Sequence, residues 1–64
     1  MNRSQEEERK MTCYEICFER FGSSRTEWTI DKQKAKKTVY NLRLNGYVVD
    51  VFAHTKRGRH KAYL

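Results

Sequence analysis

Two cysteines and two histidines are the residues of this sequence most readily associated with metal chemistry. Cys13-x3-Cys17 and His54-x5-His60 come near the local spacings of small zinc sites, which bind through thiolates and imidazoles. However, residues 12–21 alternate like a β-strand, in which a four-residue step spans about 13 Å, too far for two thiolates to share one ion. We therefore expect no metal and no other cofactor, and we expect both cysteines to be small apolar thiols on a sheet surface.

The histidines are also the only side chains that ordinarily titrate near neutral pH, which makes them candidates for general acid–base catalysis. No nucleophile elbow, phosphate-cradling glycine loop or paired-carboxylate setting accompanies them in the sequence. We therefore expect a protein that binds other molecules and is not an enzyme.

Phosphate binding is the chemistry that the basic residues offer. Residues 56–61 read KRGRHK and should lie at the tip of a two-stranded ribbon, where arginine forks can bind phosphate oxygens in pairs. The same charges could instead protect a strand edge from aggregation, and the sequence carries no signature of base-specific recognition. The candidate nucleic-acid-binding residues are Lys32, Lys36, Arg43, Lys56, Arg57, Arg59, His60 and Lys61.

Exposed apolar residues offer protein contacts as the alternative. Tyr40 and Leu44 are four residues apart in a predicted helix and should touch on its outer side, although lysine stems could simply cover them. A second apolar surface is expected on the uncovered sheet face, where Val48 and Phe52 would lie with Cys13, Cys17, Glu15, Glu19 and Asp50. The candidate protein-interaction residues are Gln33, Lys36, Lys37, Tyr40, Leu44, Val48 and Phe52.

These side chains must be positioned by a short chain with a thin core. The protein has 64 residues, of which 38% are hydrophobic and 34% charged, so a single sheet face under one helix is the expected core. We expect residues 1–10 to form a flexible polar tail and residues 11–64 to form one domain.

The first strand is predicted over residues 12–21, with Tyr14, Ile16 and Phe18 facing inward, and a turn follows at 22–24. Alternation resumes at residues 27–30, which predicts the second strand of a hairpin. The inward residues of that strand are expected to be Trp28 and Ile30.

A helix is predicted from about residue 32 to 45, because Asp31 can cap its first turn and Asn45-Gly46 can end it. Further strands are expected from Tyr47 to Thr55 and from His60 to Leu64, on either side of a turn at Gly58. The fold class is therefore α+β, a small antiparallel sheet (ββαβ or ββαββ) with one helix on one face. The expected core stripes are Ala35, Thr38, Val39 and Leu42 on the helix and Tyr47, Val49, Val51 and Ala53 on the third strand.

Charge is distributed unevenly along the chain. Residues 1–31 contain seven acids and five bases, whereas residues 32–64 contain one acid and nine bases, so a polyanion would meet the second half first. No apolar run approaches the roughly 18 residues of a membrane span, and the N-terminal residues lack the apolar segment of a secretion signal. We expect a cytoplasmic protein with reduced thiols and no membrane partner.

Residues 41–64 (helix end, Asn-Gly-Tyr, strand, Gly-Arg-His, strand) resemble the small mRNA-cleaving toxins of the HicA type. That resemblance implies a general acid or base at His60 and phosphate binding by Arg57 or Arg59. The chain lacks the Gly-Ser-His sequence of the family, and two strands precede its helix. More broadly, the basic helix followed by Asn-Gly-Tyr-x-Val-x-Val is similar to short accessory proteins of phages and mobile elements, which implies a host-directed binding role.

The sequence therefore favours a non-catalytic protein-interaction module, such as an adaptor or inhibitor of a host protein, with nucleic-acid binding as the alternative function. The basic ribbon lacks interleaved aromatic residues, whereas apolar residues recur on two outward surfaces. An uncovered, half-apolar sheet face also predicts that the partner can be a second copy of the chain, in a homodimer.

Overall fold

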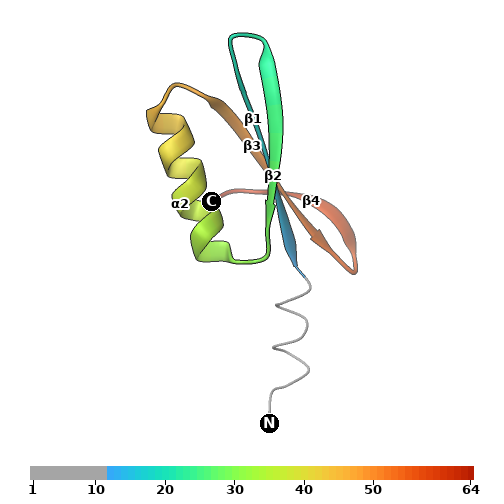
Figure 1. Ribbon diagram of the computed structural model, residues 1–64. Coiled ribbons are helices and arrows are strands. Elements are labelled where there is room, and N and C mark those ends of the chain that lie inside the picture. Colours follow the sequence, from blue (N-terminus) through green and yellow to red (C-terminus); the bar gives the residue numbers. More distant parts are fainter. Residues whose placement is uncertain (1–11) are drawn as a thin grey trace.

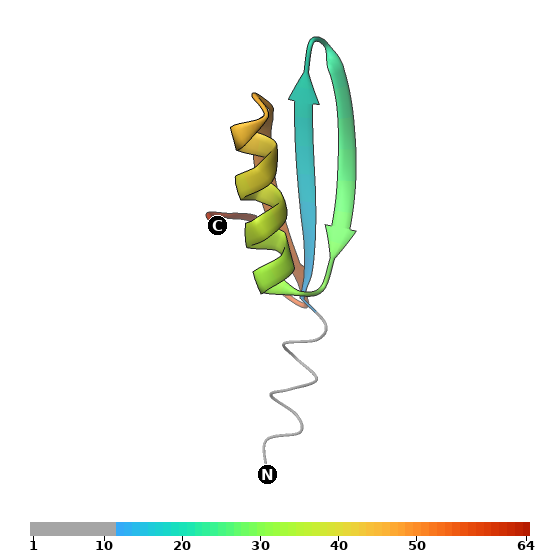
Figure 2. The same cartoon turned by 60° about the vertical axis from the view of Figure 1, so that its left-hand side comes forward.

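The computed structural model describes residues 12–64, so the tail predicted at residues 1–10 lies outside the described residues. Strands β1 (Cys13–Arg20) and β2 (Ser23–Thr29) form a hairpin, helix α2 (Lys32–Leu44) follows, and β3 (Val48–Thr55) and β4 (Gly58–Ala62) form a second hairpin. The four strands make one antiparallel sheet in the order β2-β1-β3-β4, with α2 on one face (Figures 1 and 2). The predicted α+β class is confirmed in its ββαββ form.

Helix α2 begins and ends at the predicted signals. The Asp31 carboxylate accepts hydrogen bonds from the backbone N–H groups of Gln33 (2.9 Å) and Lys34 (3.2 Å), which satisfies donors that a helix N-terminus leaves unpaired. At the other end Asn45 is the C-cap and Gly46 adopts a left-handed φ of 83°, a conformation that glycine takes at little cost. Sequence-local chemistry therefore sets both ends of the helix.

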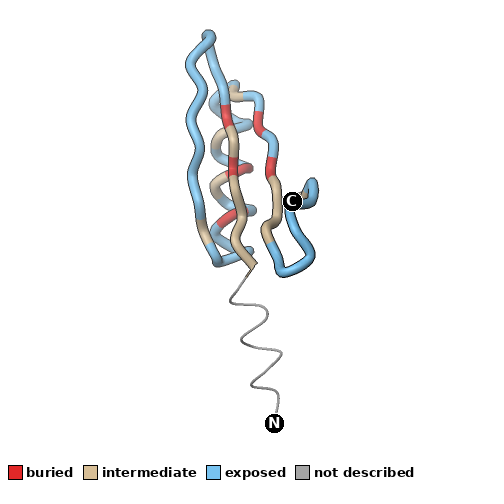
Figure 3. The backbone as a smooth tube through the Cα atoms, turned by 90° about the vertical axis from the view of Figure 1, so that its right-hand side faces the viewer, coloured by how far each residue is buried: buried red, intermediate tan, exposed pale blue. Residues whose placement is uncertain are grey.

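The core is one layer between α2 and the two central strands (Figure 3). It contains six buried residues, two from each of β1, α2 and β3: Ile16, Phe18, Ala35, Val39, Val49 and Val51. Tyr14, Leu42, Tyr47, Ala62 and Leu64 pack around it, and Tyr47 meets Phe18 edge to face at a centroid distance of 5.5 Å. The inward stripes predicted for β1, α2 and β3 are confirmed.

The prediction that Trp28 and Ile30 face inward is wrong, because their side chains are 59% and 58% exposed. The loop of the first hairpin has two residues, Phe21 and Gly22, and it pairs Trp28 with Glu15. Residues directly opposite in a sheet share a face, so Trp28 lies on the face away from α2. Ile30 follows the end of β2 in the connection to the helix.

Two turns also differ from their predicted positions. The first loop is Phe21-Gly22, where φ angles of 55° and 76° correspond to the type I′ turn that suits two-residue hairpins. The second loop is Lys56-Arg57, and β4 begins at Gly58 instead of His60. The earlier start of β4 fixes which of its basic side chains share a face.

Candidate functional site

The outer side of α2 is strongly basic. Its sequence contains Lys32, Lys34, Lys36, Lys37 and Arg43 and no acid, and all five cations are exposed. Beside them Tyr40 is 64% and Leu44 68% exposed. The predicted interaction residues of the helix, which also include Gln33, therefore lie together on the surface.

Three of these cations lie in a row. At 100° per residue, Lys32, Lys36 and Arg43 fall within about 40° of one another around the helix axis. Arg43 also lines a hollow of about 350 Å³ with residues 62–64, which follow or end β4. The row therefore faces the β4 side of the molecule. We call this row, with the neighbouring Tyr40, the α2 basic surface.

The uncovered face of the sheet is organised around Glu15. One carboxylate oxygen of Glu15, Oε1, lies 2.7 Å from His54 Nε2 and 3.1 Å from Arg59 Nε. The hydrogen bond with His54, aided by Arg59, lowers the pKa of Glu15 below its ordinary value despite partial burial, which acts in the opposite direction. Glu15 is therefore ionised at neutral pH and is joined to both basic neighbours.

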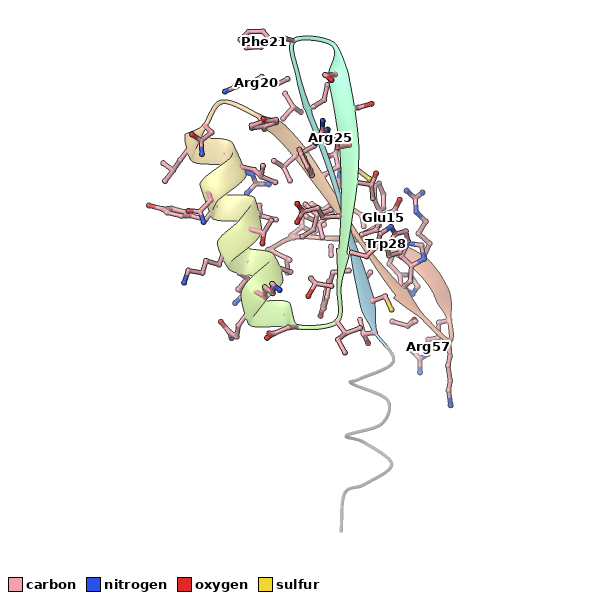
Figure 4. All side chains as sticks on the ribbon, in the orientation of Figure 1. Glu15, Arg20, Phe21, Arg25, Trp28 and Arg57 are labelled. Atoms are coloured by element: carbon pink, nitrogen blue, oxygen red, sulfur yellow. The ribbon has the colours of Figure 1, made fainter. Side chains whose placement is uncertain are left out.

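Aromatic rings lie beside the same cluster. The Arg59 guanidinium carbon lies 3.7 Å from the centroid of the Phe52 ring, and the rings of Trp28 and His54 have centroids 5.0 Å apart. Figure 4 shows Glu15 and Trp28 on the side of the sheet away from α2. Aromatic and basic residues do not alternate along the ribbon, but pairing of the strands in the sheet brings them together.

A second ion pair lies on this face. Lys61 Nζ lies 2.7 Å from Asp50 Oδ1, and this hydrogen bond raises the pKa of Lys61. Within residues 12–64, Arg59 and Lys61 are the two Lys or Arg side chains that form ion pairs. A phosphate that bound either cation would displace a carboxylate and remain next to it, which makes the sheet face a poor surface for a polyanion.

The other Lys and Arg side chains do not share these ion pairs. Residues 12–64 contain eleven Lys and Arg residues, so nine stay without a carboxylate partner among the described residues. Of their five acids, Glu15 and Asp50 are paired and Asp31 caps α2, which leaves Glu19 and Glu27. The described part of the chain is therefore a strong net source of positive potential, mainly on the α2 side.

The two sets of interaction residues predicted from the sequence are each divided by the sheet. In β4, Arg59 and Lys61 lie on the uncovered face, opposite His54 and Phe52, whereas His60 pairs with Ala53 on the helix side. Lys56 and Arg57 form the turn, and Figure 4 shows Arg57 at that end of the molecule. In the protein-interaction set, Val48 and Phe52 lie on the face opposite the helix residues.

The roles implied by the toxin resemblance would require His60 and an arginine at one phosphate. His60 and Arg59 point to opposite faces of β4, since neighbouring residues of a strand alternate. The Nε2 atom of His60 instead lies 3.4 Å from the Thr55 hydroxyl. The geometry of this strand therefore does not bring His60 and Arg59 together, and Arg57, the other arginine that the resemblance implies, lies in the turn before β4.

The hairpin tip is a surface that the sequence pattern did not predict. Phe21 is 93% exposed and projects from the end of the β1–β2 hairpin, beyond α2 (Figure 4). The guanidinium carbon of Arg20 lies 5.0 Å from the Phe21 ring centroid and 4.8 Å from that of Tyr47. The one available signal was the order Phe-Gly before the serines, since a two-residue turn there puts an aromatic residue at its tip.

The cysteines lie on the uncovered face as free thiols, and Cys17 Sγ is 3.6 Å from Glu15 Oε2. Among residues 12–64 no three His, Cys, Asp or Glu side chains are arranged so that they could hold a metal ion. The described helix is not long and apolar enough to cross a membrane.

Comparison with protein-family models, with curated proteins and with solved structures found no match to this chain.

Proposed function

We propose that the protein binds nucleic acid through the α2 basic surface. The observation that carries this proposal is the row of Lys32, Lys36 and Arg43 on a helix that contains no acid. Cations without a carboxylate partner can release the counterions condensed on phosphates, which is the main source of sequence-independent affinity for nucleic acids. Tyr40, beside the row, supplies an exposed ring on which an unpaired base can stack.

The distribution of ion pairs supports this choice over binding by the ribbon. Arg59 and Lys61 already have carboxylate partners at 3.1 Å and 2.7 Å, whereas the helix cations have none among the described residues. Phosphate contacts position a protein on nucleic acid without reading its sequence. The expected activity is therefore binding with little base preference.

The test is the salt dependence of binding to a labelled 20-nucleotide single strand of DNA, the same sequence of RNA and a DNA duplex, measured by fluorescence anisotropy. If about four phosphates of the duplex are contacted, affinity should fall about 150-fold between 50 and 200 mM salt. The double variant Lys36→Gln/Arg43→Gln should reduce the slope of log affinity against log salt by about 1.8 on the duplex and about 1.4 on single strands.

The matched control is Arg59→Gln/Lys61→Gln, which removes the same charge from the paired cations of the sheet face. It should leave the slope nearly unchanged, because those cations contribute few phosphate contacts. Equal losses in both variants would show that only net charge matters and would reject the α2 basic surface. Absence of binding at 50 mM salt to all three ligands would reject the proposal itself.

A protein partner on the uncovered sheet face is a second candidate, as an adaptor or inhibitor would require. The observation in its favour is that both Lys and Arg side chains of this face are paired with carboxylates while Trp28 and Val48 stay exposed, and interfaces often combine apolar residues with few free charges. Partners captured from a lysate should then survive nuclease and 500 mM salt and should be lost with Trp28→Ala. Loss of every partner after nuclease treatment would reject this candidate.

A further inference from the structure

The outer edge of β2 lacks most of the features that usually prevent strand pairing, and its two charged residues, Arg25 and Glu27, have opposite signs. β2 is an edge strand of seven residues, it contains no Lys or Pro, and its pairing with β1 is continuous from Ser23 to Thr29 without a bulge. Natural proteins blunt such edges with charge, proline, bulges or a covering segment. In Figures 2 and 3 no part of residues 12–64 lies against the outer side of β2.

The loop of the hairpin determines which backbone groups point outward. Arg20 and Ser23 flank the two-residue loop, and the residues that flank such a loop exchange both hydrogen bonds. Because hydrogen-bonding direction alternates along a strand, Ser23, Arg25, Glu27 and Thr29 bond to β1. The N–H and C=O groups of Ser24, Thr26 and Trp28 therefore point away from the sheet.

These outward groups fit those of a second copy. A two-fold axis at Thr26 places Thr26 opposite its symmetry mate and Ser24 opposite Trp28, as antiparallel pairs that exchange roughly six hydrogen bonds in total. The same register places Arg25 opposite Glu27 twice, in the non-hydrogen-bonded positions where side chains are closest. Arg25 and Glu27 share the helix-side face, since they lie opposite Phe18 and Ile16.

We infer that the chain forms a homodimer in which two β2 edges pair antiparallel about Thr26, extending the sheet to eight strands. The occupant is a second copy because the edge is self-complementary in three respects. Its outward backbone groups match under the two-fold axis, its opposite charges meet, and the large Trp28 faces the small Ser24. This pairing is independent of the α2 basic surface, which lies on the other side of the core.

Disulfide trapping tests the register directly. In a Cys13→Ala/Cys17→Ala background, Thr26→Cys should place two thiols on the axis at a Cα separation of about 5.5 Å, within disulfide range. Removing Cys17 is essential, because it lies opposite Thr26 within the same chain. Circular dichroism should first show that the cysteine-free background folds. If that background does not fold, the charge exchange described below tests the same pairing in the native background.

The control is Ser24→Cys in the same background, because the two symmetry-related positions would be about 13 Å apart along the strands. Mild oxidation should cross-link the Thr26→Cys chain at least tenfold faster than the Ser24→Cys chain. Equal rates would reject this register.

Charge exchange tests the same pairing without cysteine chemistry. Arg25→Glu and Glu27→Arg should each create two like-charge contacts and raise the dimer Kd about tenfold, measured by sedimentation velocity in the native background. The double variant Arg25→Glu/Glu27→Arg should restore the Kd to within about threefold of the original. A double variant as weak as the single ones would overturn the inference, as would a native protein that stays at 7.7 kDa up to about 1 mM.

Discussion

Replacing Phe21 with asparagine should stabilise the protein, although it removes an aromatic ring. Phe21 has a φ of 55°, and a left-handed conformation costs an ordinary L-residue about 1–2 kcal/mol. Asparagine tolerates this conformation, and Asn-Gly is the preferred pair for a type I′ turn. The backbone contribution of Phe21→Asn should therefore be favourable by about 1 kcal/mol or slightly more.

The lost side-chain contacts oppose this gain only weakly. Phe21 is 93% exposed, so its burial contributes little. Its contact with the Arg20 guanidinium at 5.0 Å is an exposed cation–π interaction of about 0.5 kcal/mol. Arg20 also remains held by the Tyr47 ring and by a 2.6 Å hydrogen bond to the Asn45 carbonyl. The net gain should be about 0.5–1 kcal/mol, or about 2–8 °C in Tm.

Urea unfolding followed by Trp28 fluorescence and by circular dichroism measures this change. The midpoint should rise while the slope m stays constant. Phe21→Ala is the matched control, since it removes the same ring but keeps a residue with a Cβ in the left-handed conformation, and it should give no gain. A Phe21→Asn protein less stable than the native one would refute the reasoning and would show that the ring contributes more than the strain costs.

Three further predictions concern the cap, the carboxylate cluster and the core. Asp31→Ala should lower the free energy of unfolding by about 1 kcal/mol through loss of the helix cap, measured by urea unfolding, and Asp31→Asn should lower it less. Because hydrogen bonding by His54 lowers the pKa of Glu15 below 4.5, the carboxylate should stabilise the fold above about pH 4.5 and lose that effect as pH falls through the lower folded-state pKa. The stability difference between the native protein and Glu15→Gln should therefore disappear in acid, and a pH-independent difference would contradict the assignment. Val39→Ala should cost about 2 kcal/mol, because Val39 is buried, whereas Tyr40→Ala on the exposed side should cost under about 0.5 kcal/mol.

The parts of the fold that depend on local chemistry could be predicted from the sequence. Asp31 and Gly46 act on the backbone next to them, and the apolar spacing in α2 and β3 follows the period of each element. The position of Trp28 could not be predicted in this way, because it depends on loop length. One residue more or less in the loop changes which face every side chain of β2 occupies.

The candidate site was predictable to the same extent. The exposed cations of α2 follow from the helical period, so they could be predicted from the sequence. The division of the basic ribbon required the start of β4 at Gly58, and the neutralisation of Arg59 required its pairing with Glu15, 44 residues away. Contacts between residues so distant in sequence arise from the strand order, which no local pattern specifies.

The placement of β1 beside β3 has a consequence for how the chain folds. Each hairpin closes through a two-residue loop and can form within microseconds. The pairing of β1 with β3 must instead bring together strands that are separated by β2 and α2 in the sequence. The entropic cost of closing this long loop therefore comes before the stabilising contacts between the two strands form. We expect the β1–β3 pairing to be formed in the transition state for folding. Substitutions at Ile16 or Val51, which face each other across this pairing, should mainly slow folding, whereas those in β4 should mainly speed unfolding.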